Sequence, residues 1–189
     1  MHRAVCGATL VELIVFILIV GVAAGAILSL YAGTTKRSST PLIEKQAMAI
    51  AESLMEEIRL MPFTFCDPDD ANASTATGAF VGAGGCATTV EAMGPELAQG
   101  ETRYAALTPF DNVNDYNGFA MAGGILDITG TAIAGLGAYV AAVAVAPLAF
   151  GPAPAIPATD ALQITVTVTH PSGVAVTLTG IRTRYAPNL

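Results

Sequence analysis

Two short segments of the chain concentrate carboxylate and amide side chains, the oxygen donors that a hard cation such as Ca²⁺ binds. Neither matches an EF-hand loop: the first lacks its glycine and closing glutamate, and the second has no acid at the twelfth position. The alternative is that these side chains, next to Pro and Gly, bond their own backbone and form turns. We therefore expect no cofactor, with calcium as the open alternative. The candidate ligands are Asp67, Asp69, Asp70, Asn72, Asp111 and Asp115.

The three cysteines divide into one near the N-terminus and two in a polar stretch. Cys66 and Cys86 lie in a segment rich in Gly, Ala and Thr, whereas Cys6 precedes a long apolar run. If Cys6 is removed with a leader, the remaining pair suits one disulfide in an oxidising compartment; two unrelated thiols are the alternative. The loop-entropy model gives such a bridge roughly 3 kcal/mol. Two cysteines and two histidines in the whole chain do not predict a zinc site.

A single carboxylate lies inside the apolar run. Across residues 8–31 the only charged side chain is Glu12. As a helix this segment would span roughly 36 Å, enough to cross a hydrocarbon core of about 30 Å. A charge at the bilayer centre costs about 2.5–3.5 kcal/mol, less near the edge, and such residues tend to be functional and paired. A plain signal anchor explains the run but does not explain Glu12.

The segment Gly7-Ala8-Thr9-Leu10-Val11-Glu12, with the apolar run behind it, resembles the class III leader of type IV prepilins and type II secretion pseudopilins. In that family a prepilin peptidase cuts after the glycine, the new N-terminus is methylated, and most subunits need the glutamate at the fifth mature position to assemble. The resemblance implies cleavage between Gly7 and Ala8, N-methylation of Ala8 and an assembly role for Glu12. Ala8 departs from the family, which usually has Phe there.

This resemblance gives Glu12 a physical task. A free α-amino group has a pKa near 8 and is mostly cationic at neutral pH. In a filament core of packed helices, Glu12 of one subunit can pair with the Ala8 amine of a neighbour. Because a buried charge without its partner is strongly penalised, the pair would set the register between subunits.

A second resemblance is carried by four further segments, residues 45–52, 66–73, 110–116 and 182–185. They resemble the minor pilin-like subunits of the mannose-sensitive haemagglutinin (MSHA) pilus of Gram-negative bacteria. The resemblance implies an initiating or tip-proximal subunit, anchored once in the inner membrane with its head in the periplasm and later present in the pilus at the cell surface. The partners it implies are the prepilin peptidase, other pilin subunits, the assembly platform and the membrane. A type II secretion minor pseudopilin and a pilus-tip adhesin are the alternatives.

The rest of the chain predicts an α+β fold, a long helix packed on a small antiparallel sheet. Apolar residues recur at helical spacing over residues 42–60, after an interruption at 38–41 where Pro41 should kink or restart the helix; Pro62 should end it. Residues 63–100 lack periodicity and predict a long loop. The expected strands are residues 102–107, 125–129, 139–146, 162–170 and 174–185. The expected organisation is a leader (1–7), a transmembrane assembly helix (8–31), its amphipathic continuation (32–62) and a β-rich head (63–189).

Composition argues against two classes of function. The net charge is −7 and no Lys/Arg cluster is present, so the chain does not favour nucleic acid as a partner. A nucleophile elbow, a phosphate loop and a His-rich motif are all missing, so we do not expect an enzyme.

Overall fold

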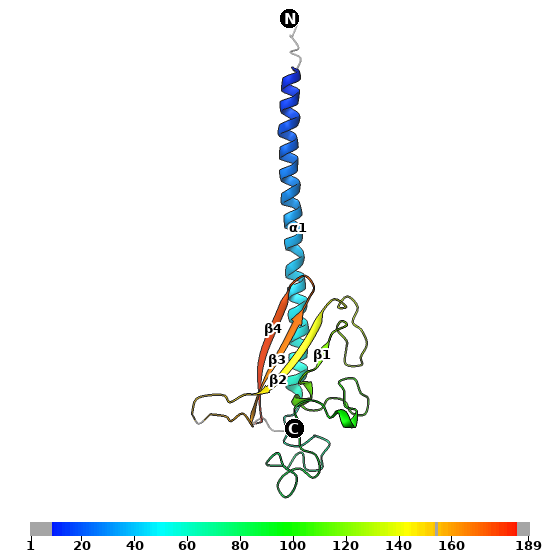
Figure 1. Cartoon of the computed structure of the whole chain (residues 1–189), viewed down its shortest axis with the longest axis vertical. Coiled ribbons are helices and arrows are strands. Elements are labelled where there is room, and N and C mark those ends of the chain that lie inside the picture. Colours follow the sequence, from blue (N-terminus) through cyan, green and yellow to red (C-terminus); the bar gives the residue numbers. More distant parts are fainter. Residues whose placement is uncertain (1–8, 154, 185–189) are drawn as a thin grey trace. The chain divides into compact units, whose positions relative to one another are not determined.

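The computed structural model describes residues 9–153 and 155–184, with the backbone alone for residues 30–40. Within these residues the chain forms one helix, α1 (Leu10–Leu60), two 3-10 turns and four strands, an α+β fold as predicted (Figure 1). Contacts divide the chain into two compact units, Met1–Leu42, here called the N-terminal unit, and Ile43–Leu189, here called the head. The other elements are η1 (Leu97–Gln99), η2 (Val113–Tyr116), β1 (Ala120–Met121), β2 (Val140–Pro147), β3 (Ala161–Thr169) and β4 (Ala175–Thr183).

The helix does not restart at Pro41. The backbone is helical throughout α1, with Pro41 inside it, although a proline removes one backbone donor and crowds the preceding turn. The expected interruption with a restart at residues 38–41 is therefore wrong, whereas the kink at Pro41 stays a prediction. The helix ends at Leu60, two residues before Pro62, as expected for the position ahead of a proline.

The four strands form one antiparallel sheet in the order β1-β2-β3-β4. The predictions at 139–146, 162–170 and 174–185 are confirmed as β2, β3 and β4, within the described residues. The predictions at 102–107 and 125–129 are wrong. The first is a turn-rich loop, and the second forms only one isolated bridge, between Leu126 and Ala132, beside the glycine turns that flank it. The two-residue strand β1 was not predicted.

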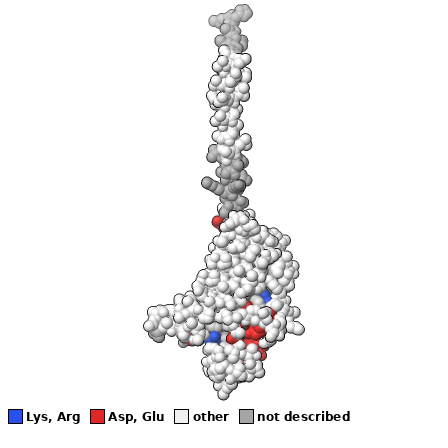
Figure 2. Space-filling view, in the orientation of Figure 1, with Lys and Arg blue, Asp and Glu red and all other residues white. Residues whose placement is uncertain are grey.

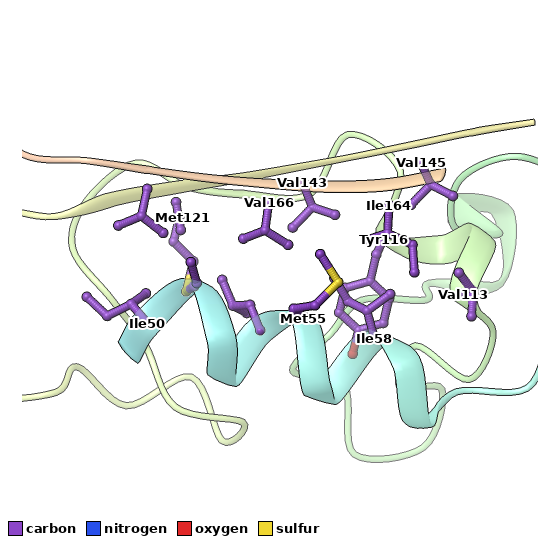
Figure 3. Packing of buried hydrophobic residues seen from close by; sticks show 14 of the residues in the cluster. Ile50, Met55, Ile58, Val113, Tyr116, Met121, Val143, Val145, Ile164 and Val166 are labelled. Carbon is purple, nitrogen blue, oxygen red and sulfur yellow. The ribbon is translucent and has the colours of Figure 1, made fainter. Parts of the chain in front are cut away.

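The core of the head lies between the second half of α1 and one face of the sheet. Figure 3 shows Ile50 and Ile58 of the helix directed towards Val143 and Val166 of the strands. Buried and exposed side chains alternate along β2, so one face of the strand packs on the helix. Each large apolar side chain buried in this way contributes roughly 1.5–3 kcal/mol.

Two glycines allow close or tight geometry in this layer. Gly173 ends the turn between β3 and β4 with a φ of 89°, which side chains other than glycine rarely adopt. Gly180 of β4 lies so close to α1 that a Cβ there would come within 2.8 Å of the Met55 sulfur. The sheet can therefore approach the helix closely at this point.

The connections between the elements are long and locally bonded. Cys66 and Cys86 form a disulfide with Cα atoms 5.4 Å apart, and Cys66 also pairs as a bridge with Val90. Residues 63–100 are loop with the single turn η1, as predicted. In the connection between β2 and β3, Phe150 and Ile156 exchange both backbone hydrogen bonds, at 3.0 and 2.9 Å.

Candidate functional sites

The first candidate site is the apolar half of α1. The segment Leu10–Ser29 is, by length and composition, able to cross a membrane, at roughly 30 Å for 20 residues. Its side chains are exposed around the whole helix; Phe16 is 67% and Leu18 65% exposed. A helix that is apolar on every side is typical of a membrane span or of a site enclosed by other helices.

Glu12 lies in the first turn of this helix. The Thr9 hydroxyl accepts the backbone N–H of Glu12 at 3.3 Å, and the Thr9 carbonyl accepts that of Leu13 at 3.2 Å. Thr-x-x-Glu is the signature of a capping box, and a carboxylate near a helix N-terminus is favoured by the helix dipole. Glu12 therefore has a local role besides the predicted pairing between subunits. The predicted processing residues Gly7 and Ala8 lie outside the described residues.

The second candidate site is a group of seven carboxylates in the head, here called the acidic cluster. Four were predicted as metal ligands, and three glutamates were not. The carboxylate oxygens form three triads, each with its members within 4.8 Å of one another, and two residues are shared between triads. Figure 2 shows acidic side chains gathered in one patch on the visible face of the head. The triads are Asp67, Asp69 and Asp111; Glu91, Glu96 and Asp115; and Glu101, Asp111 and Asp115.

The other two predicted ligands have structural partners instead. The Asp70 carboxylate accepts backbone N–H groups of Thr88 and Thr89, at 2.7 and 2.9 Å, as well as those of Ala87 and Asn72. These bonds, that from Thr89 first, hold the Asp70 pKa well below its usual range. The Asn72 amide donates to a backbone carbonyl across the same loop at 3.0 Å. Both side chains act as turn residues, the alternative that the sequence left open.

Backbone bonds and the disulfide bring the acidic segments together. Asp67 directly follows the bridged Cys66, and the N–H of Glu91 donates to the Phe65 carbonyl at 3.1 Å. The η2 segment is fixed to the same strip of chain, because the Asn112 amide donates to the Thr64 hydroxyl at 2.7 Å. Acidic residues far apart in sequence therefore face one small volume.

Several oxygens in the cluster have no donor. Asp115 is only 1% exposed; its Oδ2 accepts the backbone N–H groups of Asp111 and Asn112 at 2.9 and 2.6 Å, but its Oδ1 has no partner. Both carboxylate oxygens of Glu91 and one of Glu96 are also buried without a partner. Unbonded buried oxygens of this kind are rare and require an explanation.

Burial and mutual repulsion raise the pKa values of the cluster. Burial, followed by the charges of Asp115 and Glu96, raises the pKa of Glu91 to about 10. Burial is also the first cause for Glu96 and Asp111, whose pKa values rise to about 7, and for Asp115, whose pKa rises to about 6. The cluster is therefore a region of strongly negative potential.

Among the described residues no salt bridge reaches the cluster. The two that form join Arg103 to Glu57 at 2.7 Å and Arg184 to Asp160 at 3.8 Å. The Arg184 guanidinium also stacks on the ring of Phe63, 3.7 Å from its centre. Its charge is electrostatically coupled to Glu91, but burial lowers its own pKa to about 10.

The three glutamates escaped prediction because they are spread over a loop without periodicity. A usable signal was the charge balance of the whole loop region. Residues 61–119 contain eight acids and one basic residue, Arg103. When a region with this excess of acids is closed by a disulfide and folds compactly, some of its carboxylates must lie close together.

Comparison of the chain with models of protein families, with curated proteins and with solved structures finds no match.

Proposed function

We propose that the chain is a structural subunit of a type IV pilus-like filament, matured between Gly7 and Ala8 and inserted once in the inner membrane before assembly. The resemblance at residues 45–52 and 110–116 favours a minor subunit of the MSHA type. One observation carries the proposal: Glu12 is the lone charge in an apolar helix that is exposed around its whole surface.

The exposed apolar surface supports two successive environments. Before assembly, lipid tails can cover side chains such as Phe16 and Leu18. In a filament, the same side chains can pack against helices of neighbouring subunits, because this packing requires only an apolar helix surface of complementary shape. Apolar packing alone does not fix how far one helix is shifted along its neighbour. The Glu12 carboxylate can fix this register, because its ion pair with a neighbouring subunit forms at one relative position of the two helices.

The disulfide of the head supports a location outside the cytoplasm. The Cys66–Cys86 disulfide persists in oxidising compartments such as the periplasm, and is rare in the reducing cytosol. The sheet packs on the part of α1 that belongs to the head, and the apolar side chains of Leu10–Ser29 are exposed. A folded head on an unpartnered apolar helix is the expected form of a subunit that assembles through its helix.

Glu12→Gln tests the proposal. Glutamine can serve at the third position of a capping box as glutamate does, so this change removes the charge and keeps the cap. We expect normal membrane insertion and loss of the subunit from purified filaments. The matched control is Thr9→Ala, which weakens the helix start by about 1 kcal/mol but keeps the charge; this variant should still enter filaments.

Normal incorporation of Glu12→Gln would contradict the assembly role. Equal loss in both variants would assign Glu12 to the helix start alone. Mass spectrometry of the filament-bound subunit should show a methylated chain that begins at Ala8, and a chain that begins at Met1 would contradict the maturation step.

A further inference from the structure

We propose that Glu91, Glu96 and Asp115 form the centre of a Ca²⁺-binding site in the head, with Glu101 and Asp111 beside it. The site does not depend on the proposed filament role, because every residue in it belongs to the head. It also differs from the candidate ligands that the sequence indicates, since its two central glutamates come from the loop between the predicted segments.

The spacing of the oxygens suits a single bound ion. Ca²⁺ binds oxygen at 2.3–2.6 Å, so two ligands of one ion can lie up to about 5 Å apart. The oxygens of Glu91, Glu96 and Asp115 meet this condition, and those of Glu101, Asp111 and Asp115 meet it as a second triad. Asp115 belongs to both triads and therefore lies where the two sets of oxygens converge.

The unpartnered oxygens indicate an ion within the triad of Glu91, Glu96 and Asp115. Asp115 is almost fully buried, yet its Oδ1 has no hydrogen-bond donor, and three oxygens of Glu91 and Glu96 are in the same position. The bonds that Asp115 does make, to Oδ2, fix its carboxylate in one orientation. A cation supplies at once the positive charge and the coordination that these oxygens lack.

No described basic side chain neutralises these oxygens. Arg184 forms its salt bridge with Asp160, at 3.8 Å, and among the described residues no salt bridge reaches the cluster. A divalent cation therefore needs to displace no basic side chain there.

The donor set selects calcium among common cations. All the ligands are carboxylate oxygens, which are hard donors. Zinc and copper prefer thiolate and imidazole ligands, so this donor set does not favour them. Mg²⁺ requires a near-ideal octahedron at 2.0–2.1 Å and retains several waters, whereas Ca²⁺ accepts six to eight oxygens in irregular geometry. Carboxylates held by loops and 3-10 turns provide the irregular geometry that Ca²⁺ accepts.

The test uses the full chain in detergent, stripped with EDTA and desalted. Adding 5 mM CaCl₂ at pH 7.5 should raise the thermal midpoint of the head by about 5 °C or more, and calorimetry should give a Kd between roughly 1 µM and 1 mM. Equal stabilisation by 5 mM MgCl₂, or by NaCl of the same ionic strength, would overturn the assignment, because it would show charge screening alone.

Variants separate an ion site from a merely crowded loop. Glu91→Gln with Asp115→Asn should raise the midpoint in EDTA, since it removes repulsion, and should abolish the response to calcium. Glu52→Gln, an exposed helix position outside the cluster, should keep the wild-type response. Calcium binding unchanged in the double variant would overturn the proposed ligands, and an absent response in the wild-type chain would overturn the site.

Discussion

The two halves of α1 carry glutamates with opposite surroundings. Glu57, in the head, accepts two hydrogen bonds from the Arg103 guanidinium and one from the Tyr116 hydroxyl, all at 2.7 Å. Burial pushes its pKa up, but the bonds from Arg103 and Tyr116 outweigh burial and lower it overall. Glu12, in the apolar half, has only its place at the helix start.

The apolar side chains differ in the same way. Leu54 is 3% exposed and packs in the core of the head, whereas Leu18, on the same helix, is 65% exposed. One half of the helix is thus stabilised by its own chain, and the other half presents both apolar surface and a charge to something else. The acidic cluster resembles Glu12 in this respect, because its charges are not neutralised by the described chain.

Breaking the paired charge should have the largest effect. Arg103→Met leaves the Glu57 carboxylate partly buried without its cation, and should lower the free energy of unfolding of the head by about 3–5 kcal/mol. Denaturant titration of the full chain in detergent measures the change. The double variant Glu57→Gln with Arg103→Met should lose less than the single variant, because no charge is left unpaired. A larger loss in the double variant would contradict the pairing.

The contrast between apolar positions can be tested with one type of substitution. Leu54→Ala should destabilise the head by about 2–5 kcal/mol, because it removes buried methyl groups and leaves a cavity. Leu18→Ala should leave the unfolding of the head unchanged within about 0.5 kcal/mol. The same titration reports both, and an equal loss at Leu18 would show that the apolar half is part of the folded core.

Much of this contrast could be predicted from sequence, because periodic patterns carry it. The helical spacing of Ile50, Leu54 and Ile58 predicts the buried stripe, and the alternation in 162–170 predicts β3. The restart at Pro41 did not occur, because a helix that continues on both sides of a proline can tolerate one missing backbone bond. The strand at 125–129 failed because isolated apolar residues between glycine turns have no neighbouring strand to pair with.

The acidic cluster was only half predictable, for a different reason. Asp67 and Asp111 stand out because acids are dense around them, whereas Glu91, Glu96 and Glu101 are each separated by four neutral residues. Their meeting depends on a disulfide and on backbone bonds such as that from Glu91 to Phe65, which have no sequence period. Asp70 shows the opposite case, since it lies in the dense acidic segment but its carboxylate accepts backbone N–H groups of the same loop.

Removing the disulfide should have an intermediate effect confined to the head. Replacing Cys66 and Cys86 by serine should cost about 3 kcal/mol of stability, because the unfolded chain regains the freedom of the closed loop. The calcium response should weaken as well, since Asp67 and Glu91 lose a shared anchor. Thermal unfolding with and without calcium measures both effects. Stability of the serine variant equal to that of the oxidised wild-type chain would contradict the anchoring role. The reduced wild-type chain is the control and should match the serine variant.

The smallest predicted effect is a dependence of the head on pH. In EDTA, Glu96 and Asp111 have pKa values of about 7 and Asp115 about 6, all above their values in an unfolded chain. Glu91, whose pKa rises to about 10, extends this difference to higher pH. The folded state therefore holds more protons than the unfolded state between about pH 4 and 10, and stability is lost as pH rises through that window. The thermal midpoint should be about 5 °C higher at pH 5 than at pH 7.5.

Calcium should flatten this trend, because the ion and the protons compete for the same carboxylates. Below about pH 4 the trend should reverse, since the lowered pKa values of Glu57 and Asp70 mean that their stabilising bonds are lost on protonation. Glu91→Gln with Asp115→Asn is the matched control and should show a weaker rise between pH 7.5 and 5. If the midpoint in EDTA instead falls steadily from pH 7.5 to 5, the carboxylates of the cluster are not crowded in solution, and the contrast between Glu57 and these acids fails.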